Sequence, residues 1–290
     1  MNNLVLFSPQ SLAETCEMLA ETRGKLIAGG TDVIPQMRDG RFPVDTLIDL
    51  GHVRCLDDIQ QLGGHTSMGA MTTYTAMRRS SLLRTAAPLL VEAAGLVGGV
   101  QVQNRGTIGG NIVNASPAGD TLPPLLALNA EVTLINSDGE RTLPVSDFLM
   151  GPGSTRIGPD EVVRAVRFQP LAAGTRSTFM RLGNRRGMVI SNVSAAVVLT
   201  LDMDNRVEDV RIALGAVAPT AIRCREAESL LIGQVLTEEL IELASAAAVE
   251  RSSPIDDVRG TASYRLHGIR VLVRRSLETM GGLREPGGCL

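Results

Sequence analysis

Two short glycine-rich segments contain the residue types most able to do chemistry. The first is Ala28-Gly29-Gly30-Thr31-Asp32, at the end of a predicted strand and the start of a predicted helix. The second is Thr107-Ile108-Gly109-Gly110-Asn111, inside a stretch rich in Gly, Asn and Ser. Glycine lets the backbone approach a phosphate closely, and the amides at the start of a helix point toward an anion. In the second segment, the side chains of Thr107 and Asn111 could add donors. One amide cradle for each phosphate would suit a diphosphate.

Neither segment matches a familiar nucleotide motif. The G-x-G-x-x-G pattern of NAD sites and the G-x-x-x-x-G-K-[ST] pattern of ATP sites are both missing from them. Each Gly-Gly pair could also do no more than make a tight turn. The residues alone therefore leave two readings open, a binder of a phosphorylated ligand or a pair of turns.

Two further groups of polar residues have both a structural and a functional interpretation. Asp120 follows a Pro-x-Gly turn and precedes a predicted helix, so it could cap that helix, accept a sugar or ribityl hydroxyl, or do both. Arg181, Arg185 and Arg186 could form a solvated charge cluster. They could equally meet negative charge on a ligand or on a partner.

Composition excludes several classes of protein. The chain has 290 residues, enough for about two domains, and 44% of them are hydrophobic, which argues against disorder. Its net charge of −3 and its aromatic content of 2% disfavour nucleic acid as a partner, because such proteins need basic surfaces and aromatic stacking platforms.

The cysteines and the hydropathy pattern predict a cytoplasmic protein without a resident metal. Cys16, Cys55, Cys224 and Cys289 lie far apart, and they form no C-x-x-C motif. The three histidines are also separated, and none has the spacing of metal ligands. The sequence contains neither an 18-residue apolar span nor a basic, then apolar, leader at its beginning, so we expect no transmembrane segment.

The elements that must position the two segments follow from apolar periodicity and from turn residues. In the first half we expect strands at residues 4–7, 25–28, 46–50 and 161–168, hairpins at 59–70 and 131–143, and helices from Ser8 to Gly24, 31–40, 72–79 (capped by Thr72), 81–96 and 122–128. Residues 98–120 are predicted to be a long functional loop.

The pattern changes after Gly174, where an Arg- and Gly-rich stretch precedes two apolar strands. We expect strands at 193–201 and 207–217 and helices near 226–231, 237–251 and 263–279. The predicted domains are therefore residues 1–176 and 177–285.

Four segments, taken in order, resemble the FAD-binding medium subunits of the molybdenum hydroxylases, a family that includes carbon monoxide, xanthine, nicotine and aldehyde dehydrogenases. They are LIAGGTDVIPQMR, GTIGGNIVNASPAGDTLPPLLALNAEV, GPGSTRIGPDEVV and FMRLGNRRGMVISNVSAAVVL. The resemblance covers nearly the whole chain. It differs at Val189-Ile190, where many members of this family have an Asp-Ile or Asp-Tyr step.

This resemblance implies an α+β fold, with an FAD-binding domain of the vanillyl-alcohol-oxidase type in two subdomains, followed by a smaller α+β domain. It also implies that the two glycine-rich segments hold the diphosphate and approach the flavin. The residues implied to bind FAD are Ala28, Gly29, Gly30, Thr31, Asp32, Val33, Ile34, Thr107, Ile108, Gly109, Gly110, Asn111, Asp120, Val163 and Arg181. No catalytic acid or base and no metal ligand is implied within this chain.

The implied activity is electron transfer. A large molybdopterin-binding subunit would oxidise the substrate, a small [2Fe–2S] subunit would pass the electrons on, and FAD in this chain would deliver them to an acceptor, within a dimer of heterotrimers. Two alternatives stay open at this point. The chain could be a self-sufficient FAD-dependent NAD(P)H reductase on the same FAD-binding fold, or a scaffold or nucleotide sensor whose glycine pairs hold no redox cofactor.

Overall fold

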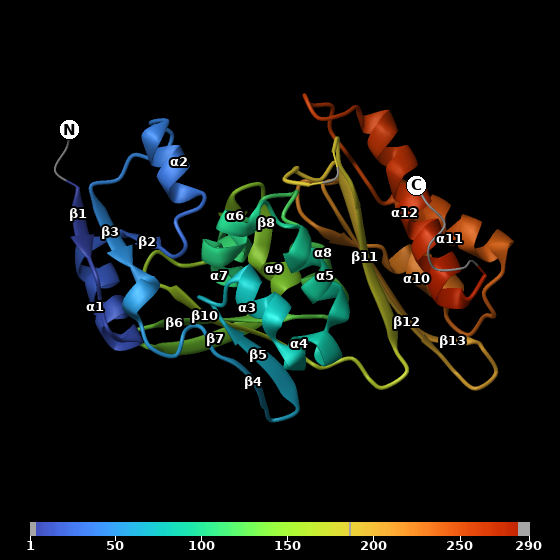
Figure 1. Cartoon of the computed structure of the whole chain (residues 1–290), viewed down its shortest axis with the longest axis horizontal. Helices are drawn as coiled ribbons and strands as arrows, with labels where there is room; N and C mark the ends of the chain where they lie inside the picture. Colours follow the sequence, from blue (N-terminus) through green and yellow to red (C-terminus); the bar gives the residue numbers. More distant parts are fainter. Residues whose placement is uncertain (1–3, 186, 284–290) are drawn as a thin grey trace.

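The computed structural model describes residues 4–185 and 187–283, which form three regions in a row (Figure 1). The N-terminal region is a parallel three-stranded sheet of order β1-β3-β2, packed against helix α1. Its elements are β1 (Val5–Phe7), α1 (Leu12–Thr22), β2 (Lys25–Ile27), α2 (Val33–Arg38), β3 (Thr46–Asp49) and the 3-10 helix η1 (Leu50–His52). Ser11, not Ser8, caps α1, because its hydroxyl accepts the Glu14 amide at 3.2 Å.

The middle region is an antiparallel sheet of order β4-β5-β10-β6-β7, with helices on one face. Apolar side chains of these strands and helices form the main hydrophobic core. The elements of this region are β4 (Ile59–Leu62), β5 (His65–Gly69), α3 (Tyr74–Arg79), α4 (Ser81–Ala86), α5 (Pro88–Leu96), α6 (Val100–Arg105), α7 (Ile108–Asn114), α8 (Leu122–Ala127), β6 (Glu131–Asn136), β7 (Gly139–Pro144), α9 (Val145–Phe148), β8 (Leu149–Gly151), β9 (Ser154–Thr155) and β10 (Val162–Phe168).

Several predicted helices in this region need correction. Thr73, not Thr72, caps α3. The helix predicted over residues 81–96 is two helices, because Pro88 has no amide hydrogen and begins α5 at its first turn. The predicted loop at 98–120 contains α6 and α7. Helix α6 is held by the buried Gln103, whose side-chain amide donates to the carbonyls of Gly95 and Val97, both at 3.0 Å. A tertiary contact of this kind leaves no periodic pattern in the sequence.

The C-terminal region is an antiparallel sheet of order β11-β12-β13-β14 that separates two cores. One face packs on the middle region through Phe179, Ala196 and Val198. The other face packs under the C-terminal helices, which lie beyond the sheet in Figure 1. The elements are β11 (Arg176–Leu182), β12 (Val193–Leu201), β13 (Val207–Gly215), β14 (Ile222–Arg223), α10 (Arg225–Leu231), α11 (Glu238–Glu250) and α12 (Ala262–Gly281). Strand β11 is half polar and was not predicted from the sequence.

None of the helices within residues 4–185 and 187–283 combines the length and apolar character needed to cross a bilayer. The glycine-rich segments lie where the first two regions meet, and Asp120 and Arg181 lie where the second region meets the third.

Candidate functional site

The first glycine-rich segment forms the turn between β2 and α2. Gly30 has a φ of +71°, a backbone conformation that favours glycine. A side chain at Gly29 would place its Cβ 1.7 Å from the carbonyl oxygen of Arg105 and 3.0 Å from the amide nitrogen of Gly106. Gly29 therefore allows this turn to lie directly on the junction between α6 and α7, next to the second glycine-rich segment.

The turn presents unpaired amides to solvent. In the part of the chain that the structure describes, the backbone N–H groups of residues 29–33 donate to no protein acceptor. The carbonyls of Gly30 and Asp32 accept the amides of Ile34 and Gln36, both at 3.1 Å, which begins α2. Thr31 and Asp32 are exposed, and the Asp32 side chain makes no cap hydrogen bond. Consecutive unpaired amides of this kind fit an anion such as a diphosphate.

The second glycine-rich segment is constructed differently, because its amides already have protein partners. Thr107 caps α7, with its hydroxyl accepting the Gly110 amide at 3.1 Å and its carbonyl accepting the Asn111 amide at 3.0 Å. The amides of Ile108 and Gly109 donate to the carbonyls of Thr72 and Ala70, at 3.0 and 2.9 Å. The expectation of a second amide cradle is therefore wrong for residues 108–111.

The two glycines of this segment have separate physical roles. A Cβ at Gly109 would lie 2.7 Å from the Ala70 Cβ and 2.8 Å from its carbonyl oxygen, so Gly109 permits close packing inside the protein. Gly110 is exposed, and a Cβ there would meet only the Thr107 hydroxyl, at 3.0 Å. The surface that this segment offers a ligand is therefore formed by Gly110 and the partly exposed Asn111.

Asp120 is a buried carboxylate with two partners from the C-terminal region. Its Oδ2 accepts Arg181 Nη1 at 2.6 Å, and its Oδ1 accepts the Ser191 hydroxyl, also at 2.6 Å. Both Asp120 and Arg181 side chains are less than a tenth exposed. Burial raises the pKa of Asp120, and the hydrogen bond from Ser191 and the charge of Arg181 oppose that rise. Asp120 does not cap α8, because Thr121 occupies the N-cap position.

Hydrogen bonds connect Asp120 to the second glycine-rich segment. The Thr121 hydroxyl donates to Asn111 Oδ1 at 2.5 Å. Tyr74, whose ring is buried, lies near both groups: burial raises the pKa of its hydroxyl, and so does the negative charge of Asp120, whereas a hydrogen bond with Asn111 lowers it. The structure thus brings Asn111, Asp120 and Arg181 together, although they are distant in the sequence.

Val163 lies apart from this cluster in the main core, with its side chain 4% exposed. It precedes a bulge in β10, and the carbonyl of Arg164 in that bulge accepts the amide of Ala70 at 3.0 Å. Ala70 in turn accepts the Gly109 amide, so a short backbone connection links the bulge to α7. Three contacts could not be predicted from the sequence, because each joins residues far apart in the chain. They are the acceptance of the Gly109 amide by Ala70, the hydrogen bond of Ser191 to Asp120, and the close approach of the Arg105 carbonyl to Gly29.

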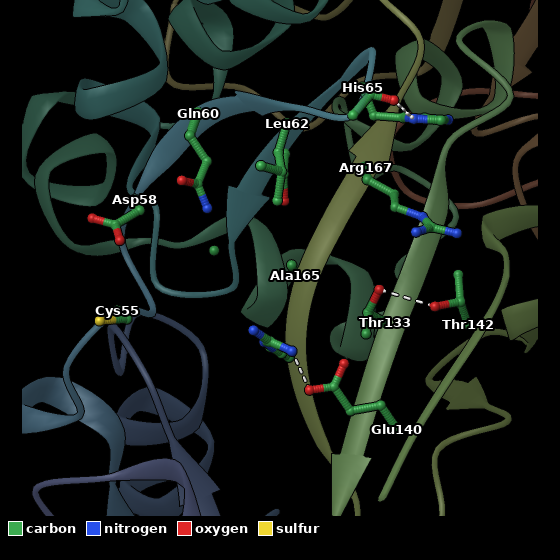
Figure 2. Close-up of a pocket in the computed structure, with 14 residues that line it drawn as sticks. Cys55, Asp58, Gln60, Leu62, His65, Thr133, Glu140, Thr142, Ala165 and Arg167 are labelled. Carbon is green, nitrogen blue, oxygen red and sulfur yellow. Dashed lines mark hydrogen bonds and ion pairs between the residues drawn. The ribbon is translucent and has the colours of Figure 1, made fainter.

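The described residues also form hollows that none of the residues implied to bind FAD lines. Figure 2 shows one of about 450 Å³ on the polar face of the five-stranded sheet, where the Thr133 and Thr142 hydroxyls lie 3.1 Å apart and Glu140 pairs with Arg164. None of the predicted site residues lines it. Another, of about 430 Å³, adjoins the predicted site through the loop after Arg181, and it is lined by Asn184, Arg185, Met188, Val189, Ile190 and Arg259.

Comparison with known families identifies both halves of the chain. Residues 2–170 match the family described as "FAD binding domain in molybdopterin dehydrogenase". Residues 178–280 match the family described as "CO dehydrogenase flavoprotein C-terminal domain".

Individual relatives align over almost their full length. The carbon monoxide dehydrogenase medium chain of Hydrogenophaga pseudoflava is 34% identical, over 93% of this chain and 94% of the relative. The nicotine 6-hydroxylase medium subunit of Paenarthrobacter nicotinovorans is 32% identical, over 94% and 96%. A solved structure of the Hydrogenophaga pseudoflava carbon monoxide dehydrogenase, in a form lacking the Mo-pyranopterin moiety of the molybdenum cofactor, superposes with a TM-score of 0.92 at 33% identity, covering 97% of this chain and 98% of that one.

Proposed function

The chain belongs to the family of FAD-binding medium subunits of the molybdenum hydroxylases, and we propose that its FAD passes electrons from iron–sulfur clusters in a partner subunit to a terminal acceptor. The observation that carries this proposal is the row of unpaired amides at residues 29–33, which lies directly against the α6–α7 junction. Such a row of amides suits the diphosphate of a dinucleotide.

The residues of the proposed site fit FAD, and different groups among them would contact different parts of it. The amides of residues 29–33 would hold the diphosphate. Gly110 offers an open surface for close approach, and Asn111 has a side-chain amide beside it. Asp120 would accept a ribityl or ribose hydroxyl on the lone pairs that Ser191 and Arg181 leave free.

The remaining members of the proposed set are assigned to FAD by the resemblance. They are Ala28, Ile34, Thr107, Ile108 and Gly109 beside the diphosphate, and Val163 and Arg181 beside the flavin. Thr107 and Gly109 support this surface through the helix cap and the contact with Ala70.

Bound FAD supplies the redox chemistry, since a flavin can exchange electrons singly or in pairs. The contribution of this chain is to bind the dinucleotide, to fix its orientation and to place charged groups near it. Arg181 holds the loop carbonyl of Val189 at 3.2 Å while it pairs with Asp120, so one guanidinium fixes both the carboxylate and the loop that follows β11.

We place the substrate chemistry and the metal centres in partner subunits. These would be a large molybdopterin-binding subunit and a small [2Fe–2S] subunit, assembled with this chain as a dimer of heterotrimers. The medium-subunit names of the relatives support this arrangement. The proposed domains are residues 1–176 and 177–285, of which 284 and 285 lie outside the described residues. The start of the C-terminal sheet at Arg176 supports this division into two domains. The proposed location is the cytoplasm, as predicted from the sequence.

Purification of the chain with its native partners tests the proposal. We expect a yellow complex that releases FAD on denaturation and contains molybdenum and iron in the other subunits. FAD at 100 times its dissociation constant should stabilise the isolated chain by about 2.7 kcal/mol. A colourless chain that FAD does not stabilise would contradict the proposal. Steady NAD(P)H oxidation by the isolated chain would instead support a self-sufficient reductase.

A further inference from the structure

Arg265 is a fully buried cation in α12, with 1% of its surface exposed. Its Nη1 donates to the carbonyls of Asn192 and Ala216, both at 3.0 Å, and its Nη2 donates to Asp257 Oδ1 at 2.7 Å. Burying a guanidinium is costly unless it is paired and hydrogen-bonded, so this arrangement is a specific one.

The carboxylate partner of Arg265 is itself fixed. Asp257 accepts the backbone amide of Arg259 at 2.8 Å and the Arg259 guanidinium through Nε at 2.9 Å and Nη2 at 2.5 Å. The hydrogen bond from the Arg259 side chain lowers the pKa of Asp257, with further lowering from the Arg259 amide and from Arg265. Asp257 is therefore ionised at neutral pH, and it fixes one side of the Arg265 guanidinium.

The other side of Arg265 faces the segment that reaches the proposed FAD site. Asn192 donates its amide to the Leu182 carbonyl at 2.8 Å, and its side chain donates to Asn184 Oδ1 at 2.7 Å and to the Arg259 carbonyl at 3.2 Å. The preceding residue, Ser191, is 0% exposed and donates to Asp120 Oδ1. The carbonyl that Arg265 holds and the hydroxyl that holds Asp120 therefore belong to consecutive residues, Asn192 and Ser191.

We propose that Arg265, held by Asp257, is a positioning residue for the flavin site. It fixes residues 191–192 so that Ser191 and Arg181 together orient the Asp120 carboxylate. This inference deepens the proposed function and rests on it. Arg265 touches neither Asp120 nor the proposed diphosphate cradle, so its effect on FAD passes through Ser191.

Lysine at position 265 would keep the charge but not the geometry. A guanidinium directs two nitrogens toward Asp257 and toward the two carbonyls at once, whereas an ammonium is a single point charge. We expect Arg265→Lys to leave residues 191–192 less restrained.

Arg223 provides a matched control in the same region. It pairs with Glu228 through Nε at 2.7 Å and Nη2 at 2.8 Å, and it also donates to the Leu126 carbonyl and the Asn129 side chain. This buried pair makes no hydrogen bond with residues 181–185 or 187–192. Arg223→Lys should therefore lower stability without affecting the Asp120 cluster.

The test uses the full chain and two kinds of measurement. Hydrogen exchange of residues 188–193 in the FAD-free chain should accelerate about tenfold in Arg265→Lys and remain at the wild-type rate in Arg223→Lys. FAD titration should show a dissociation constant raised about tenfold in Arg265→Lys, with altered visible circular dichroism of the bound flavin, and a change under about twofold in Arg223→Lys.

A double-mutant cycle tests whether Arg265 acts through Ser191. In a Ser191→Ala background, Arg265→Lys should weaken FAD binding by less than about twofold. Two results would overturn the proposal. One is that the effects of Ser191→Ala and Arg265→Lys on FAD binding are fully additive. The other is that Arg265→Lys and Arg223→Lys, compared at an equal loss of melting temperature, have the same hydrogen exchange and the same FAD affinity.

If Arg265→Lys does not fold, Asp257→Asn takes its place with the same expected results. A wild-type chain that does not bind FAD would refute the proposed function, while the exchange measurement would still decide whether Arg265 restrains residues 191–192.

Discussion

The two Gly-Gly segments have nearly the same sequence pattern and opposite uses of their backbone. In residues 29–33 the amides have no protein acceptor among the described residues, and the turn is partly exposed. In residues 108–111 every amide donates to a protein oxygen. A glycine pair followed by a polar residue therefore does not by itself predict an anion cradle.

The difference lies in what each glycine allows. Gly29 lets one backbone lie on another, and Gly30 lets the chain turn with a positive φ. Gly109 lets α7 pack on Ala70, and only Gly110 leaves open surface. The first segment is thus predicted to bind the diphosphate directly. The second is a packed helix start that presents one glycine and one amide side chain.

Gly29→Ala should have the largest effect on the first segment. Its Cβ would lie 1.7 Å from a backbone carbonyl that cannot rotate away, so the turn must move off the α6–α7 junction. We expect FAD affinity to fall about 100-fold, equivalent to about 3 kcal/mol, in a fluorescence titration. Gly151→Ala is the control, since a Cβ there would meet no atom within 4 Å. Equal FAD affinity in both variants would contradict the role of this turn.

Gly109→Ala should mainly affect stability. A methyl group 2.7 Å from the Ala70 Cβ overpacks a backbone contact, and we expect a loss of about 2 kcal/mol in urea unfolding.

Gly110→Ala is the matched control for Gly109→Ala in the same helix. It should leave stability unchanged or raise it by up to about 1 kcal/mol, because alanine favours helix. Its methyl group stands on the proposed ligand surface, so FAD affinity should fall more in Gly110→Ala than in folded Gly109→Ala. A larger loss of FAD affinity in folded Gly109→Ala than in Gly110→Ala would show that Gly109, and not Gly110, forms the ligand surface.

Thr107→Ala removes a helix cap and frees the Gly110 amide. We expect a loss of about 1 kcal/mol in the free energy of unfolding, the usual value of such a cap. Thr237→Ala, at the cap of α11, should cost a similar amount and leave FAD binding unchanged. If the freed Gly110 amide then binds the diphosphate, FAD affinity will be higher in Thr107→Ala than in Thr237→Ala. The second glycine-rich segment would then present an unpaired amide, as the first one does.

Asp32→Asn should have the smallest effect. The Asp32 carboxylate is exposed and makes no cap hydrogen bond, so we expect a stability change below about 0.5 kcal/mol. Removing a negative charge beside a diphosphate should tighten FAD binding by no more than about threefold, and less at high salt. Weaker binding in the titration would show that the carboxylate itself contacts the ligand.

The family, the α+β fold and FAD as the cofactor were predicted from sequence, and the comparisons confirm them. The motifs that carry the resemblance are local, and local patterns can be read directly. The use of the amides in residues 108–111 could not be predicted, because their acceptors on Ala70 and Thr72 lie more than thirty residues away. Asp120 was predicted as a site residue, but its hydrogen bond with Ser191 could not be predicted, because the two residues lie 71 positions apart.

Helix α6 and strand β11 escaped prediction for a similar reason. Glycines on both sides of residues 100–105 indicate turns, and the helix is stabilised by Gln103 contacts made in the folded protein. Strand β11 alternates poorly, because Phe179 packs into the main core, Met180 and Leu182 pack against the C-terminal core, and Arg181 pairs with Asp120. Tertiary structure overrides local propensity in both places.

The sheet β11–β14 makes it difficult to separate the chain into two independently folding pieces. Phe179, Ala196, Val198, Ala213 and Ala221 from this sheet and its flanking loop complete the hydrophobic core of the middle region. Residues 1–176 produced alone would therefore leave an uncovered apolar wall, with α5 and α8 exposed to water and prone to self-association. We therefore expect the two family domains, which share this core, to melt as a single cooperative unit.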